Sequence, residues 1–137
     1  IMRRMMYRIS AIIASRRNAK ILINGESIGQ VASQTLTSMS AINEVVNIPV
    51  IRPPACFDKL DIIDIAKSID TYETSILPYE DCCTIFLPKH PVIHPELGKC
   101  IQAEAEFGYE SLIDECVENI ETISSFDQEE TEMADLL

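Results

Sequence analysis

Glycine is scarce in this sequence, and the four glycines are spread out, at positions 25, 29, 98 and 108. A glycine-rich phosphate loop requires glycines at close, fixed spacings, and no such pattern occurs in the 137 residues. No apolar run is long enough to span a membrane, and no signal peptide with a cleavage site is visible. Internal repeats are also absent. These absences predict a cytoplasmic protein that is not a membrane protein.

The five cysteines do not form the paired framework of a small disulfide-bonded domain, which favours a reducing compartment over secretion. The length suits one domain, since a chain of this size buries about two thirds of its unfolded surface. The apolar fraction of 47% is ordinary for a globular domain.

Acidic residues are absent from the start of the chain, and basic residues are rare at its end. All charged residues through position 20 are basic: Arg3, Arg4, Arg8, Arg16, Arg17 and Lys20. From Glu96 onward the sequence has thirteen acidic residues and one basic residue, Lys99. The formal net charge of the whole chain is −11. An acidic chain repels RNA, so nucleic-acid contact is expected through the basic N-terminal residues. The alternative is that these residues form a solvated helix face that meets other domains.

Hydrophobic spacing predicts an α/β fold. The expected order is helix 1–18, strand 20–24, helix 28–45, strand 48–51, helix 58–70, a cysteine loop at 74–94 and helical segments within 96–122. Alternating strands and helices favour a parallel sheet that helices cover on both faces. The two strands should be parallel neighbours, so that Gly25 and Arg52 lie beyond their carboxyl ends. In the first helix Met2, Met5, Met6, Ile9, Ile12 and Ile13 form an apolar stripe, and the arginines lie off it.

The segment 21–36 combines a short apolar strand, a glycine and an expected helix with a polar stripe. Ser27, Gln30 and Gln34 line up on one face of that helix. A strand, a glycine turn and the polar first turn of a helix are typical of nucleotide sites in open α/β sheets. Many such turns carry glycine for steric reasons alone, which is the alternative here.

Adjacent cysteines, Cys82 and Cys83, lie between prolines that keep the backbone extended. Neighbouring side chains of an extended segment point to opposite faces, so one thiol at most faces a given crevice. Lys89 and His90 follow, and cationic groups lower the pKa of a thiol, which favours a reactive cysteine. The alternatives are a strand with one buried and one exposed cysteine, or a zinc site formed by the two cysteines with His90 and His94. Cys100 and Cys116 are expected in the core.

Three segments carry a specific resemblance. They are Asn-Gly-Glu-Ser-Ile-Gly-Gln-Val-Ala-Ser-Gln-Thr-Leu (24–36), Ile-Pro-Val-Ile-Arg-Pro (48–53) and Pro-Tyr-Glu-Asp-Cys-Cys-Thr-Ile-Phe (78–86). The sequence closely resembles the tRNA 4-thiouridine synthase family, also called tRNA uracil 4-sulfurtransferase or thiamine-biosynthesis sulfurtransferase. The resemblance implies that 1–123 form the C-terminal half of an ATP-pyrophosphatase (PP-loop) domain. The composition of 124–137, rich in Asp, Glu and Ser with little to bury, predicts an acidic, disordered tail. The RNA-binding modules and a Ser-Gly-Gly-x-Asp-Ser pyrophosphate loop of the family are expected to precede this piece.

The resemblance also implies roles for individual residues. The nucleotide contacts of the family fall on Arg3, Gly25 and Gln34, although Arg4 beside Arg3 is equally available as a cation. The catalytic cysteine falls on Cys83, which precedes Thr84-Ile85-Phe86. Members with an appended rhodanese domain have glycine after this cysteine, whereas this chain has Thr84 and no such domain. The disulfide partner of those members therefore has no match here. The second thiol stays open between Cys82, Cys56 and another protein. No metal ligands are implied.

The implied reaction uses ATP, with Mg²⁺ in the full-length enzyme, to adenylate O4 of a tRNA uridine. Persulfide sulfur from a cysteine desulfurase then replaces AMP and gives 4-thiouridine, with a role in thiamine thiazole synthesis as a further implication. The tRNA is expected to bind mainly through the preceding modules, and this piece alone is expected to be inactive. The alternatives are a purely nucleotide-binding or oligomerising module, such as a homodimer, and a Cys/His metal-binding domain.

Overall fold

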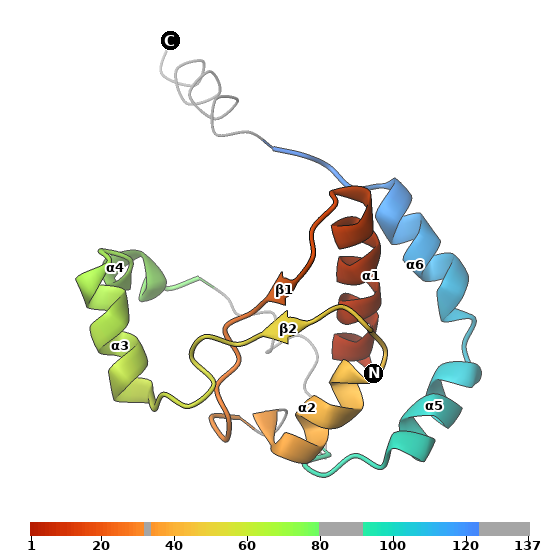
Figure 1. The fold of residues 1–137 in the computed structure, drawn as a ribbon, viewed down its shortest axis with the longest axis horizontal. Helices are drawn as coiled ribbons and strands as arrows, with labels where there is room; N and C mark the ends of the chain where they lie inside the picture. Colours follow the sequence, from red (N-terminus) through yellow and green to blue (C-terminus); the bar gives the residue numbers. More distant parts are fainter. Residues whose placement is uncertain (32–33, 80–91, 124–137) are drawn as a thin grey trace.

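The computed structural model describes residues 1–31, 34–79 and 92–123. Their elements, in chain order, are α1 (Met2–Arg16), β1 (Leu22–Ile23), α2 (Leu36–Asn43), β2 (Val50–Ile51), α3 (Lys59–Ser68), α4 (Tyr72–Ser75), α5 (Leu97–Ala105) and α6 (Tyr109–Glu118) (Figure 1). Within these ranges, each helix is too short or too polar to cross a membrane. The expected tail at 124–137 lies outside the described residues.

The two strands form a small parallel sheet, as the sequence predicts. Leu22 pairs with Val50 and Ile23 with Ile51. Backbone hydrogen bonds from Leu22 N to Pro49 O (2.8 Å) and from Asn24 N to Ile51 O (3.1 Å) extend the pairing on both sides. The connection between the strands contains α2, so the fold is mixed α/β. Because the strands are parallel, the residues after Ile23 and Ile51 meet at the same edge of the sheet.

The core lies between one face of this sheet and helices α1 and α2. A buried cluster consists of Tyr7 of α1, Ile42 of α2 and Val46 from the segment after α2. Leu22 and Val50 of the strands pack against it. The next residue of each strand, Ile23 and Ile51, is exposed, because successive side chains of a strand point to opposite faces. The prediction of helices on both faces is therefore wrong for the described residues, which leave this second face open.

The buried face of α1 differs from the predicted apolar stripe. Arg4, Tyr7 and Ala14 are buried, whereas Met2 and Met6 are exposed. Carboxylates from other elements meet the Arg4 guanidinium, and a buried charge is tolerated when it is paired and hydrogen-bonded. Met5, Ile9, Ile12 and Ile13 of the stripe are half-buried, so apolar spacing alone identified only part of the buried face.

Helix α2 begins eight residues later than the predicted helix 28–45. Thr35 caps it, because its side-chain oxygen accepts a hydrogen bond from Ser38 N at 3.1 Å. Upstream, Gly29 adopts a left-handed φ of 82°, which is incompatible with a continuous right-handed helix. Ser27 and Gln30 are therefore outside the helix, and the predicted helical stripe does not form.

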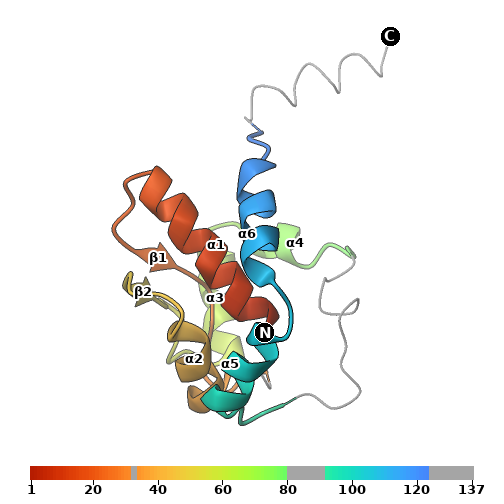
Figure 2. The same cartoon turned by 90° about the vertical axis from the view of Figure 1, so that its right-hand side faces the viewer.

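The C-terminal part follows the predicted periodicity more closely. Asp58 and Asp61 form the capping box expected at the start of α3. Helices α5 and α6 are separated near Gly108, as predicted, and α6 packs along α1 (Figure 2). Only the last two residues of helix α4 fall within the predicted cysteine loop at 74–94, and the part of that loop at 80–91 lies outside the described residues.

Candidate functional site

A cavity of about 310 Å³ lies between α1 and the carboxyl end of β1. It brings together Arg3 from α1, Gly25 from the turn after β1 and Gln34 from the segment before α2. Its other lining residues are Met6, Tyr7, Ser10, Leu22, Ile23, Asn24, Glu26 and Val50. The mixture of apolar walls with a few convergent polar groups is typical of small-molecule sites, and this volume is at the lower end of their range. The three residues expected to contact a nucleotide thus share one cavity.

Gly25 leaves open space in the cavity wall. A Cβ atom placed on this residue meets no heavy atom within 4 Å, and its φ is outside the left-handed region. Neither crowding inside the chain nor backbone strain therefore requires glycine here. The space that its missing side chain leaves belongs to the cavity.

Gln34 contributes an acceptor that has no donor among the described residues. Its Oε1 is buried and makes no hydrogen bond with them, while its backbone carbonyl accepts from Gly29 N at 2.9 Å. Leaving a buried polar atom unpaired costs free energy, so such an atom is a natural contact for a ligand donor.

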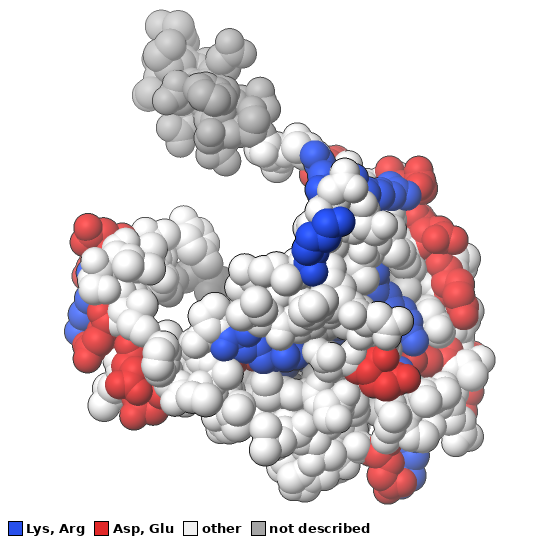
Figure 3. All heavy atoms as spheres, viewed as in Figure 1, with Lys and Arg blue, Asp and Glu red and all other residues white. Residues whose placement is uncertain are grey.

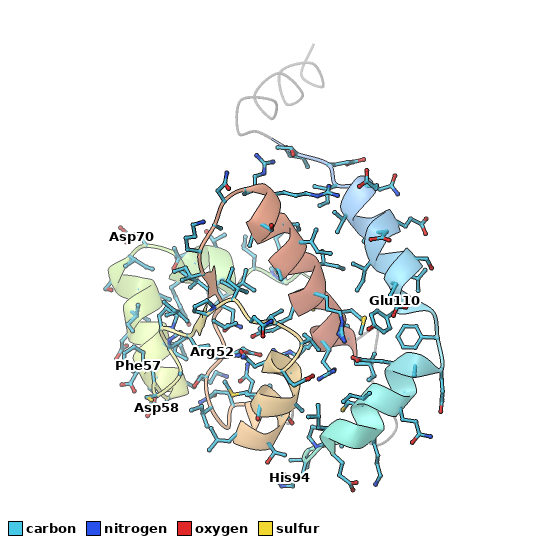
Figure 4. The ribbon with its side chains drawn as sticks, turned by 45° about the vertical axis from the view of Figure 1, so that its right-hand side comes forward. Arg52, Phe57, Asp58, Asp70, His94 and Glu110 are labelled. Atoms are coloured by element: carbon cyan, nitrogen blue, oxygen red, sulfur yellow. The ribbon has the colours of Figure 1, made fainter. Side chains whose placement is uncertain are left out.

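Glu26 is buried beside the cavity and joins the two strand ends to α1. Its Oε1 contacts Arg3 Nη1 at 2.6 Å, and its Oε2 contacts Arg52 Nε at 2.7 Å. The Tyr7 hydroxyl and Asn24 Nδ2 also donate to Oε2, each at 3.0 Å. Arg52, labelled in Figure 4, reaches from the end of β2 to Asn43 Oδ1 of α2 at 3.2 Å. The carboxylate is thus a shared acceptor at the sheet edge.

These contacts keep Glu26 ionised. Burial alone would raise the pKa of its carboxyl, but hydrogen bonds from Arg52 and Asn24 and the charge of Arg3 outweigh burial, so the pKa is below its ordinary value. Burial and the neighbouring Glu26 charge raise the pKa of Tyr7, which keeps its hydroxyl a donor. Arg3 and Arg52 carry two positive charges against the single negative charge of Glu26, so these three side chains together have a net positive charge.

Sequence reasoning placed Gly25 and Arg52 at the same sheet edge, and their position there is confirmed. It missed the roles of Glu26, Tyr7 and Asn24. One signal was present: Glu26 and Arg52 follow neighbouring parallel strands, so their opposite charges had to meet at one edge.

Arg4 does not compete with Arg3 for the cavity. Its Nε and Nη2 donate to the two carboxylate oxygens of Glu104 at 2.6 and 3.0 Å, and its Nη1 donates to the Ala41 carbonyl. Its Nη2 also contacts Glu44 Oε2 at 3.1 Å. Arg4 therefore connects α1 to α2 and α5, whereas the neighbouring Arg3 lines the cavity.

The expected basic N-terminal face is divided. Besides the buried Arg4, Arg8 pairs with Glu104 at 3.1 Å and lies 4.6 Å from the centre of the Tyr109 ring. Arg16, Arg17 and Lys20 are exposed near the end of α1. Figure 3 shows an acidic band along the side of the molecule that α5 and α6 occupy. A continuous basic surface along α1 is therefore not formed by the described residues.

The predicted catalytic Cys83, with Cys82, Lys89 and His90, lies outside the described residues. His94 is exposed, and no group of three or more potential metal ligands occurs in the part of the chain that the structure describes. Cys56 is exposed. The prediction that Cys100 and Cys116 are core residues is wrong: Cys100 is half-buried and Cys116 exposed, because α6 buries Ile113 and Val117 instead.

Comparison with known proteins decides the family. Residues 1–109 match the family described as thiamine biosynthesis protein (ThiI). The chain belongs to the ThiI family. It is 51% identical over 124 residues to a probable tRNA sulfurtransferase of Moorella thermoacetica, covering 90% of this chain and 32% of the relative. It is 55% identical over 122 residues to a probable tRNA sulfurtransferase of Staphylococcus epidermidis, covering 89% and 30%.

A solved structure of a 4-thiouridine synthetase–RNA complex with bound ATP shares this fold. The TM-score is 0.77 at 41% identity, over 85% of this chain and 30% of that one. The ThiI chain described here thus spans about a third of the length of these relatives. The expected family resemblance is confirmed.

Proposed function

We propose that this chain is the C-terminal half of the ATP-pyrophosphatase domain of an ATP-dependent tRNA sulfurtransferase that makes 4-thiouridine. The observation that carries the proposal is the single cavity that joins Arg3, Gly25 and Gln34. A relative of the same fold binds ATP and RNA, which supports a nucleotide as the ligand. The net positive charge of the arginines around Glu26 suits the phosphates.

In this proposal Arg3, Gly25 and Gln34 each have a separate role in binding the nucleotide. The Arg3 guanidinium pairs with a phosphate or stacks on the base, and the open space at Gly25 admits the adenosine. Gln34 Oε1 accepts a hydrogen bond from a ligand hydroxyl or amine, which ends its unpaired state. ATP, with Mg²⁺, is also held by the pyrophosphate loop expected elsewhere in the full-length protein.

The chemistry proposed for Cys83 follows adenylation of the tRNA uridine. O4 of the uridine attacks the α-phosphate of ATP, pyrophosphate leaves, and a cysteine desulfurase loads Cys83 with a persulfide. The terminal sulfur attacks C4 and expels AMP, and a second thiol then attacks Cys83 to form a disulfide and release the thiocarbonyl. A thiolate suits this role because it is a strong nucleophile at neutral pH. The 137 residues alone are expected to lack thiolation, because positioning of ATP needs the missing loop.

Gly25→Val tests the nucleotide site, because a Cβ at this position meets no heavy atom within 4 Å and the added methyl groups extend from the cavity wall. Gly98→Val is the matched control, since a Cβ there also meets nothing within 4 Å and Gly98 is exposed on α5. NMR titration of the ¹⁵N-labelled chain with MgATP is expected to show weak binding, with shifts near Gly25 and Gln34. Gly25→Val should weaken it at least about tenfold and Gly98→Val should not. Equal affinity of both variants, or shifts centred elsewhere, contradicts the proposal.

A further inference from the structure

The two oxygens of Glu26 have different partners. Oε2 accepts from Arg52 Nε, the Tyr7 hydroxyl and Asn24 Nδ2, at 2.7 to 3.0 Å. Oε1 contacts Arg3 Nη1 at 2.6 Å. Three donors, one from α1 and one from the residue after each strand, thus fix one oxygen, while the other is directed to the arginine that lines the cavity. Such an arrangement holds the carboxylate rigidly and leaves Oε1 to orient the Arg3 guanidinium.

The partners of Oε2 are themselves held in place. The Tyr7 hydroxyl accepts from Arg52 Nη2 at 2.9 Å and from Asn24 Nδ2 at 2.6 Å, and Asn24 Oδ1 accepts from Glu26 N at 3.1 Å. Arg52 is anchored to α2 through Asn43. A buried polar network with its members paired is rigid, so the position of Glu26 is set by the sheet edge and both core helices.

We propose that Glu26 is a positioning residue, which fixes the Arg3 guanidinium for a bound nucleoside triphosphate. This inference depends on the proposed nucleotide site. Arg3 lies in the first turn of α1 and is partly exposed, and an unrestrained arginine there samples many rotamers. The short ion pair with Glu26 removes that freedom before the ligand arrives, so less conformational entropy is lost on binding. Arg52 offsets the carboxylate charge, so Glu26 orients Arg3 without making the site negative.

A competing role is purely structural: Glu26 then supports the fold but not the ligand. The two roles differ in a double-mutant cycle of ATP affinity, because a residue that acts through Arg3 has no effect once Arg3 is replaced. The variants are Glu26→Gln, which removes the charge but keeps the shape, Arg3→Met, and both together. Glu26→Asp, which keeps the charge on a shorter side chain, and Glu118→Gln, which alters an exposed carboxylate, complete the set.

Each variant of the 137-residue chain is titrated with MgATP by NMR, and its melting temperature without ligand is measured by circular dichroism. Glu26→Gln and Arg3→Met should each weaken binding about fivefold to tenfold, and the double variant should bind no more weakly than Arg3→Met. Glu26→Asp should lie between Glu26→Gln and the wild type, and Glu118→Gln should match the wild type. If Glu26→Gln does not fold, the same cycle is run with Glu26→Asp.

The outcomes separate this inference from the proposed function. If Arg3→Met weakens binding but the Glu26 variants do not, or if their effects multiply, the positioning role is refuted and the nucleotide site stands. If Glu26→Gln binds more tightly, the carboxylate competes with the ligand for Arg3, and the inference is also refuted. If the wild type does not bind ATP, or Arg3→Met binds equally well, both proposals are overturned.

Discussion

Glu104→Gln is expected to destabilise the chain strongly, because it removes one charge from a buried ion pair. The side chains of Arg4 and Glu104 are 2% and 3% exposed, and two hydrogen bonds of 2.6 and 3.0 Å join them. Removing one partner of a buried pair costs about 3–5 kcal/mol, since the other charge stays buried without compensation. Arg4 would retain Glu44 at 3.1 Å, a side chain that is 47% exposed, and the Ala41 carbonyl. The loss should therefore be about 3 kcal/mol, at the lower end of that range.

A loss of this size is large against the total stability of a domain, which is about 5–15 kcal/mol. For a chain of this length it should lower the melting temperature by roughly 10 °C. Urea unfolding measures the free energy directly. Because the chain has no tryptophan, the helical signal in circular dichroism is the suitable observable.

The matched control is Glu118→Gln, which makes the same chemical change in an exposed pair. Glu118 is 72% exposed and contacts Arg16 at 2.8 Å. Exposed ion pairs contribute little, so the control should change the free energy of unfolding by no more than about 0.5 kcal/mol. If Glu104→Gln is as stable as Glu118→Gln, the Arg4 pair does not stabilise the fold, and the reasoning is refuted.

Two further predictions concern acid pH and the cysteines. For Glu104, as for Glu26, burial alone would raise the pKa of the carboxyl, but hydrogen bonds and arginine charges lower it below its ordinary value. Both carboxylates therefore contribute their full stabilisation of the fold above the ordinary pKa of about 4.3, and this stabilisation is lost as the pH falls below that value. Urea unfolding between about pH 6 and pH 3 should show this loss, and a smaller loss in Glu104→Gln; an equal loss in both contradicts it. In a full-length tRNA sulfurtransferase with this sequence, Cys83→Ser should abolish 4-thiouridine formation but leave pyrophosphate release intact, whereas Cys82→Ser should reduce thiolation far less. An inactive Cys82 variant beside an active Cys83 variant would reverse the assignment.

Local sequence signals predicted the parts of the fold that depend on nearby residues. The apolar runs before Gly25 and Arg52 gave two short parallel strands in the right order. The Asp58 capping box requires contacts within three residues, and it forms as expected. The shared position of Gly25, Arg3 and Gln34 came from the family resemblance instead, since they lie on three separate elements.

Distant contacts decided what local signals could not. The helix expected from position 28 matched an apolar spacing, but Ile28 N donates to the distant Ala55 carbonyl at 3.0 Å, Gly29 is left-handed, and the helix starts only at Leu36. The exposure of the sheet face that carries Ile23 and Ile51 also depends on distant elements of the chain. Strand periodicity gives two apolar faces, and it does not reveal whether a given chain supplies the cover for both.

The first turn of α1 shows why one helix can serve the fold and the site through adjacent arginines. Consecutive residues of a helix are about 100° apart, so Arg3 and Arg4 must face different surroundings. Arg4 meets Glu104, which is 100 residues away, and thereby joins α1 to α5. Arg3 meets Glu26 at the sheet edge and lines the cavity. Substitutions at these two neighbours should therefore have different effects. Replacing Arg4 should lower the free energy of unfolding, and replacing Arg3 should lower the affinity for the nucleotide.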